Sequence, residues 1–137
     1  MTYPADVRPK IYISGAITSD PNFRWKFGEA QQALESAGYY PVNPLNVPNC
    51  VNSTCWGDTP QSERNHPHTW DCYIRHDIAA LMFCDGVALL DDWFSSPGAK
   101  AEVSCADKVH IPCKSLNIWL EKAPNRIKLE GDEMKVT

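Results

Sequence analysis

The chain has 137 residues, about the length of one domain. Its 13 Lys and Arg residues against 17 Asp and Glu residues give a formal net charge of −4 at pH 7, and no run of basic residues offers a footprint for a nucleic-acid backbone. A hydrophobic fraction of 43% and a charged fraction of 22% are typical of a globular protein and exclude disorder over most of the length. We therefore expect a single domain over residues 1–137, with one site and no nucleic-acid polymer as its partner.

The cysteine count and the N-terminus together predict the cell compartment. Six cysteines would suit a disulfide scaffold only in a secreted protein. Residues 1–6 contain no basic patch followed by an apolar run, and no stretch reaches the roughly 18 apolar residues that a membrane span needs. We expect a cytoplasmic protein with reduced thiols and no membrane partner.

The first third of the chain predicts a strand, a helix and a second strand. Residues 10–14 are a β-rich run that ends in a glycine. Asp20 is the expected N-cap of the helix, whose apolar residues recur at helical spacing until Gly38, the position where a helix ends with a positive φ. Residues 39–42 predict a short strand at the edge of a sheet, because Pro41 cannot donate to a ladder.

The second half repeats the alternation of helix and strand. Helical spacing runs from about residue 69 to residue 82, and residues 86–90 form the unbroken apolar run that is typical of a central parallel strand. A further helix is predicted through residues 101–109, and residues 114–120 predict a last strand. Such an alternation forms a parallel sheet that binds ligands beyond the carboxyl ends of its strands.

Two segments fall outside this alternation. Residues 43–67 hold four prolines and no hydrophobic period, which predicts a long loop insertion, and residues 121–137 predict a polar tail that is loosely ordered. The loop also contains four side chains of types that bind zinc: Cys50, Cys55, His66 and His68. Their spacings are not those of the common zinc motifs, so a zinc-stabilised interaction module is an alternative and not the main prediction.

The strongest local signal lies in residues 89–102, where a buried strand runs into an acidic, serine-containing turn and a helix begins beside Gly98. Free backbone N–H groups and the helix dipole favour an anion there. Glu102 follows about one turn into the helix, near enough to direct its carboxylate at the bound group. In the alternative interpretation, Ser95 or Ser96 only caps the helix and Glu102 is an ordinary acidic residue of its first turn.

Two more residues are candidates because of their positions. Tyr12 in the first strand either places its hydroxyl at the binding crevice or is an ordinary core residue. Asp77 either lies within the apolar stripe of its helix, where a charge is costly unless it is paired, or points from the flank of that stripe into solvent. The sequence has no glycine-rich dinucleotide motif, no Walker lysine motif and no nucleophile elbow. We expect no metal and no organic cofactor.

Three segments carry a joint pattern in a fixed order: residues 11–17, 75–87 and 96–102. Together they resemble the nucleoside 2-deoxyribosyltransferase-like superfamily, which includes deoxynucleoside 5′-monophosphate N-glycosidases and uncharacterised bacteriophage relatives. In that superfamily a glutamate attacks the anomeric carbon of the sugar, displaces the base and forms a glycosyl-enzyme ester. The resemblance implies that Glu102 is this nucleophile.

The same resemblance assigns two further roles and indicates the substrate. It implies that Tyr12 orients the nucleophile, and that Asp77 contacts the substrate and assists protonation of the leaving base. Transferases of unphosphorylated nucleosides carry Asp six residues before the nucleophile, whereas the 5′-monophosphate hydrolases carry Ser, and here the residue is Ser96. A hydroxyl beside helix N–H groups tolerates a dianionic phosphate that an Asp would repel.

One feature departs from the hydrolases. They follow the glycine of the first strand with a serine and an arginine that bind phosphate, whereas this chain has Ala16, Ile17 and Thr18. The predicted substrate-binding residues gather at the ends of the first and third strands: Gly15, Ala16, Ile17, Asp92, Trp93, Ser96, Gly98 and Ala99.

We thus predict a flavodoxin-like α/β three-layer sandwich with a four- or five-stranded parallel sheet. The expected function is the cleavage or exchange of the N-glycosidic bond of a (deoxy)nucleoside 5′-monophosphate, with hydrolysis favoured over transfer. The resemblance also implies a homodimer. A second alternative is a non-catalytic nucleotide-binding protein that uses the same crevice.

Overall fold

The predicted alternation of strands and helices is present in the computed structural model, which describes residues 7–17, 19–46 and 70–123. The elements in chain order are β1 (Lys10–Ser14), α1 (Phe23–Ser36), β2 (Tyr40–Val42), η1 (Pro44–Asn46), α2 (Trp70–Leu81), β3 (Gly86–Leu89), η3 (Trp93–Ser95), α3 (Pro97–Lys108), β4 (Cys113–Ser115) and α4 (Leu116–Glu121). The four strands form one parallel sheet in the order β2-β1-β3-β4. The prediction of a flavodoxin-like α/β fold with a parallel sheet is therefore confirmed, as is the position of β2 at an edge.

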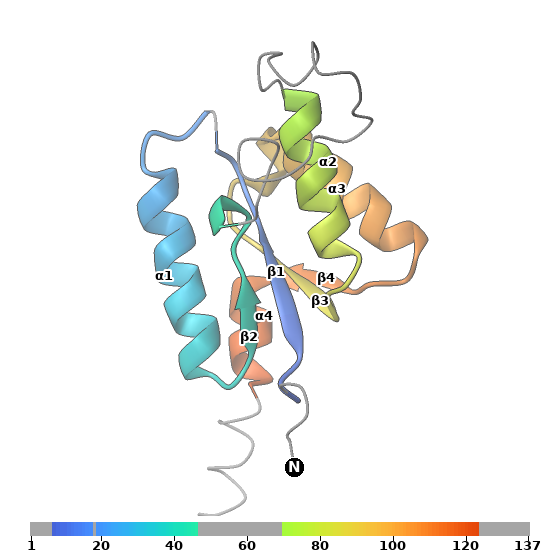
Figure 1. The fold of residues 1–137 in the computed structure, drawn as a ribbon. Helices are drawn as coiled ribbons and strands as arrows, with labels where there is room; N and C mark the ends of the chain where they lie inside the picture. Colours follow the sequence, from blue (N-terminus) through green and yellow to red (C-terminus); the bar gives the residue numbers. More distant parts are fainter. Residues whose placement is uncertain (1–6, 18, 47–69, 124–137) are drawn as a thin grey trace, which may run out of the picture.

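Helices cover both faces of the sheet. Figure 1 shows α1 and α4 on one side of the strands and α2 and α3 on the other. Successive side chains of a strand leave opposite faces, so the central strand must be apolar on both. In β1, Ile11 and Ile13 pack in the core with α1 and α4, and Tyr12 packs in the core with α2 and α3. Ser14 is the fourth fully buried residue of this run.

The two ends of α1 differ in how well they were predicted. The prediction of Asp20 as N-cap is wrong, because α1 begins at Phe23 and Asn22 occupies the cap position. Asp20 lies two residues earlier, where its carboxylate accepts the backbone N–H of Asn22 at 2.8 Å and pairs with Lys26 at 2.7 Å. The prediction for the other end is confirmed, since Gly38 has a φ of 103° just after the last turn.

The prediction of a last strand over residues 114–120 is largely wrong. The strand β4 ends at Ser115, whose hydroxyl accepts the backbone N–H of Ile118 at 3.4 Å and so caps α4. Three residues of α4 pack against the same core as α1, at the i, i+3, i+4 spacing of a helix: Leu116, Trp119 and Leu120. The segment is short and rich in apolar residues, which favoured a strand, but the spacing of these residues is that of a helix.

Contact between α4 and β3 depends on a glycine. The ring of Trp119 lies so close over Gly86 that a Cβ atom there would be 2.5 Å from it, and the ring Nε1–H donates to the carbonyl of Val87 at 2.7 Å. Only a residue without a side chain fits this approach.

The predicted insertion and tail lie largely outside the described residues. Of residues 43–67, the described part includes only Asn43 and η1, and the tail is described as far as residue 123. None of the helices in the described ranges is long and apolar enough to cross a bilayer.

Candidate active site

Glu102 is the centre of the candidate site. It lies in the second turn of α3 and is only 5% exposed, which is rare for a carboxylate. Two donors from β1 hold its two oxygens: the Tyr12 hydroxyl donates to Oε2 at 2.5 Å, and the Ser14 hydroxyl donates to Oε1 at 2.7 Å. Tyr12 and Ser14 stand two residues apart in a strand, so both side chains leave the face that α3 covers.

A second carboxylate comes from α2. The charge of Asp77 interacts with Glu102 and with Tyr12, so the structure brings these three predicted residues together from three elements. Burial is the main cause that raises the pKa of Asp77 to about 7, and the charge of Glu102 adds to it. Asp77 is half-buried, so it does not point freely into solvent as the flank interpretation required.

Burial also controls the protonation of the other two groups. It raises the pKa of Glu102 to about 7, against the hydrogen bonds from Tyr12 and Ser14, which favour the ionised carboxylate. Burial, followed by the charge of Glu102, raises the pKa of Tyr12 well above 10.0, so this hydroxyl remains a donor. Two neighbouring carboxyl groups that titrate near neutral pH can supply one ionised nucleophile and one protonated acid.

The first turn of α3 lies next to this group of residues. Ser96 is the N-cap of α3, and its hydroxyl oxygen accepts the N–H of Ala99 at 3.2 Å, as the capping interpretation required. The hydroxyl proton of Ser96 is still available to donate. The N–H of Gly98 has no acceptor among the described residues, and Gly98 precedes Glu102 by four residues, which places both on one helix face.

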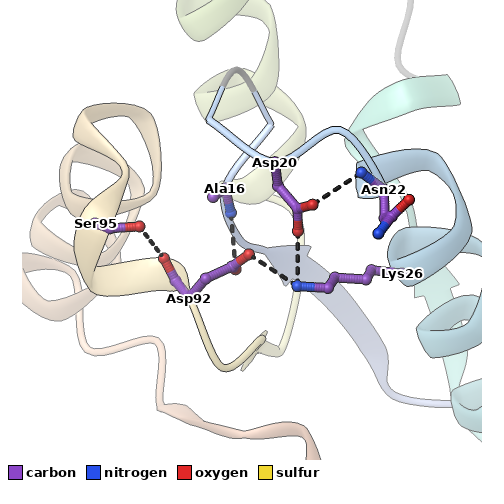
Figure 2. Close-up of polar contacts among 6 residues, drawn as sticks. All are labelled: Ala16, Asp20, Asn22, Lys26, Asp92 and Ser95. Atoms are coloured by element: carbon purple, nitrogen blue, oxygen red, sulfur yellow. Dashed lines mark hydrogen bonds and ion pairs between the residues drawn. The ribbon is translucent and has the colours of Figure 1, made fainter.

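The carboxylate of Asp92 already binds the backbone of the turn after β1 (Figure 2). The N–H of Ala16 donates to Oδ1 of Asp92 at 3.1 Å, so the predicted meeting of the ends of β1 and β3 is present. The other oxygen, Oδ2 of Asp92, pairs with Lys26 at 3.4 Å, and Lys26 pairs with Asp20 at 2.7 Å. A ligand anion at this amide would have to displace Asp92, so the start of α3 is the better place for a phosphate.

Three other predicted binding residues have packing contacts or line a different cavity. A Cβ atom on Gly15 would be 2.9 Å from Leu90, so this glycine permits close packing between the ends of β1 and β3. Ile17 packs against the core beside α1. Trp93 lines a surface cavity of about 780 Å³, together with residues of α3 and β4, and Glu102 is not part of its lining.

Sequence reasoning missed two contributors to the site region. Ser14 could have been found, because the residue two positions after Tyr12 in a strand must share its face. Lys26 gave no such signal, since its partner Asp92 is 66 residues away and the two meet only because the start of α1 lies beside the turn after β3.

The described residues contain no cluster of metal ligands. Among the residues that the structure describes, no group of three or more His, Cys, Asp and Glu side chains comes together to hold a metal ion. The four zinc candidates of the loop lie outside the described residues: Cys50, Cys55, His66 and His68.

The fold and the site define a flavodoxin-like parallel α/β domain with a buried, doubly hydrogen-bonded carboxylate at the carboxyl end of its central strand. The chain belongs to the family described as Domain of unknown function (DUF4406), which matches residues 9–115. This span runs from β1 to β4 and contains Tyr12, Asp77 and Glu102. No curated protein matches the chain.

Proposed function

We propose that the protein cleaves or exchanges the N-glycosidic bond of a (deoxy)nucleoside 5′-monophosphate, as a member of the nucleoside 2-deoxyribosyltransferase-like superfamily that its motifs resemble. One observation carries the proposal: the buried carboxylate of Glu102 is held by Tyr12 and Ser14, with the second carboxyl of Asp77 beside it. This arrangement supplies a positioned nucleophile and an acid within one site.

The proposed reaction begins with ionised Glu102 and protonated Asp77. A carboxylate oxygen of Glu102 forms a bond to the anomeric carbon, and the bond from that carbon to the base nitrogen breaks. The electron pair of the broken bond goes to the base, which takes the proton of Asp77. In hydrolysis the oxygen of a water then bonds to the anomeric carbon, the ester bond breaks and releases the Glu102 carboxylate, and Asp77 takes a proton from the water. In exchange, a nitrogen of a second base forms the new bond and gives its proton to Asp77. Neither step calls for a metal or an organic cofactor.

The start of α3 supports a phosphate on the substrate. The Ser96 hydroxyl proton and the Gly98 N–H are donors at the positive end of a helix dipole, four to six residues before Glu102. Asp92 already occupies the amide of Ala16. We therefore assign the 5′-phosphate to the start of α3, and favour hydrolysis of a monophosphate over transfer between nucleosides.

The test is a panel of nucleoside and deoxynucleoside 5′-monophosphates, with the matching nucleosides, analysed by chromatography for free base. We expect release from at least one monophosphate, and a loss of about a thousandfold or more in Glu102→Gln. Glu35→Gln, on the exposed side of α1, is the matched control and should retain full activity. No release from any substrate, or equal rates in wild type and Glu102→Gln, would refute the proposal.

The panel also separates the alternative of a non-catalytic nucleotide-binding protein. A ligand that binds only the folded state raises the melting temperature. A thermal shift with a monophosphate but no release of base would favour the alternative. The proposed homodimer is a separate matter, which light scattering coupled to size-exclusion chromatography measures directly.

A further inference from the structure

Ser14 is a polar residue in a fully buried, otherwise apolar part of β1. Its exposed fraction is 0%, as for Ile13 and Tyr12 before it. A buried hydroxyl is costly unless it is hydrogen-bonded, and the Ser14 hydroxyl donates to Oε1 of Glu102 at 2.7 Å. We propose that Ser14 is a positioning residue of the candidate site, which fixes the plane of the Glu102 carboxylate. The inference deepens the proposed function and rests on it for its catalytic part.

The geometry gives Ser14 a role that Tyr12 cannot fill alone. The last torsion of a glutamate side chain is broad, so a carboxylate held through one oxygen can still rotate about it. Tyr12 holds only Oε2. With Ser14 on Oε1 the carboxylate is held at both oxygens, and the lone pairs that remain for attack point in fixed directions.

The same hydrogen bond affects the charge of Glu102. Burial raises the pKa of Glu102, and the donors Ser14 and Tyr12 oppose that rise because they stabilise the ionised form. The other titratable groups near this carboxylate are Asp77 from α2 and, beside Tyr12, the thiol of Cys84. Loss of the Ser14 hydroxyl should therefore move the ionisation of Glu102 to higher pH.

Three variants test the kinetic part. In Ser14→Ala we expect kcat to fall about tenfold or more with KM changed less than about twofold, since misaligned groups lose rate and not ground-state binding. The acidic limb of the kcat/KM profile should move to higher pH. Ser14→Cys keeps a weaker donor of similar size and should fall between wild type and Ser14→Ala. Ser104→Ala, on the exposed side of α3, is the matched control.

A titration without substrate keeps this test separate from that of the proposed function. The carbon-13 signal of the Glu102 carboxyl, assigned by its absence in Glu102→Gln, is followed against pH in wild type, Ser14→Ala and Ser14→Cys. We expect a higher midpoint in Ser14→Ala and an intermediate one in Ser14→Cys. An unchanged midpoint would overturn the inference whatever the activity. A raised midpoint in a protein that releases no base would refute the proposed function but confirm that Ser14 positions the Glu102 carboxylate.

Discussion

The burial of Glu102 makes the stability of the fold depend on pH, and Glu102→Gln should remove that dependence. The pKa of Glu102 is about 7 in the folded protein, against an ordinary value of 4.5. Between these two values the folded protein keeps a proton that the unfolded chain has lost. The contribution of this group to stability is therefore fully present below pH 4.5 and is lost as the pH rises through 7.

The size of the effect follows from the difference between the two pKa values. A rise from 4.5 to about 7 corresponds to about 3 kcal/mol, because one pH unit is worth about 1.4 kcal/mol. The free energy of unfolding of Glu102→Gln, relative to wild type, should thus increase by up to about 3 kcal/mol between pH 4.5 and pH 8. Asp77 acts in the same direction, since part of its own raised pKa comes from the charge of Glu102.

The measurement is urea unfolding followed by tryptophan fluorescence at pH 5, 6, 7 and 8 for wild type and Glu102→Gln. Glu35→Gln is the control for the loss of a carboxylate that is exposed, and its difference from wild type should stay nearly constant. If the difference between Glu102→Gln and wild type changes by less than about 0.5 kcal/mol over this range, Glu102 is not held in a site that penalises its charge.

Two further predictions concern the fold around the site. Gly86→Ala should lower the free energy of unfolding by about 1–3 kcal/mol, because the added methyl group meets the ring of Trp119. In a Trp119→Phe background the same substitution should cost less. An equal cost in both backgrounds would contradict this contact. Ser96→Ala should lower the free energy of unfolding by about 1 kcal/mol, because the cap of the Ala99 N–H is lost, and Ser96→Gly by only a few tenths, because glycine leaves that N–H open to water. An unchanged free energy of unfolding in Ser96→Ala, measured by urea unfolding, would show that the cap does not contribute.

Most of the fold could be predicted because its signals are local. The apolar runs of β1 and β3 and the helical spacing between them are enough to predict a parallel sheet. The two errors, the N-cap of α1 and the last strand, concern short segments whose structure depends on a few residues. Asn22 occupies the cap of α1 while Asp20 pairs with Lys26, and α4 places the ring of Trp119 directly over Gly86. The first contact is local to the start of α1, and the second joins α4 to β3, which no local pattern contains.

The candidate site was predicted from sequence motifs and not from local structural signals. Tyr12, Asp77 and Glu102 lie far apart in the sequence, and only their motifs linked them before the structure placed them together. Ser14 lies within the first motif, but no role was predicted for it, although strand geometry places it on the face of Tyr12. The ion pair of Lys26 with Asp92 could not be predicted, since it depends on how α1 sits beside the end of β3.

The energetics of Glu102 also bear on why the site exists. Ionising this carboxylate in the core costs about 3 kcal/mol at neutral pH, which is a large part of the 5–15 kcal/mol that stabilises a typical domain. Glu102→Gln removes this cost and keeps an acceptor, whereas an apolar side chain in place of Glu102 would leave the buried hydroxyls of Tyr12 and Ser14 without one. Tyr12, Ser14 and Glu102 are therefore linked by hydrogen bonds, while the charge of Glu102 works against folding at neutral pH. A group of this kind is typical of a site where a perturbed carboxylate is used for chemistry.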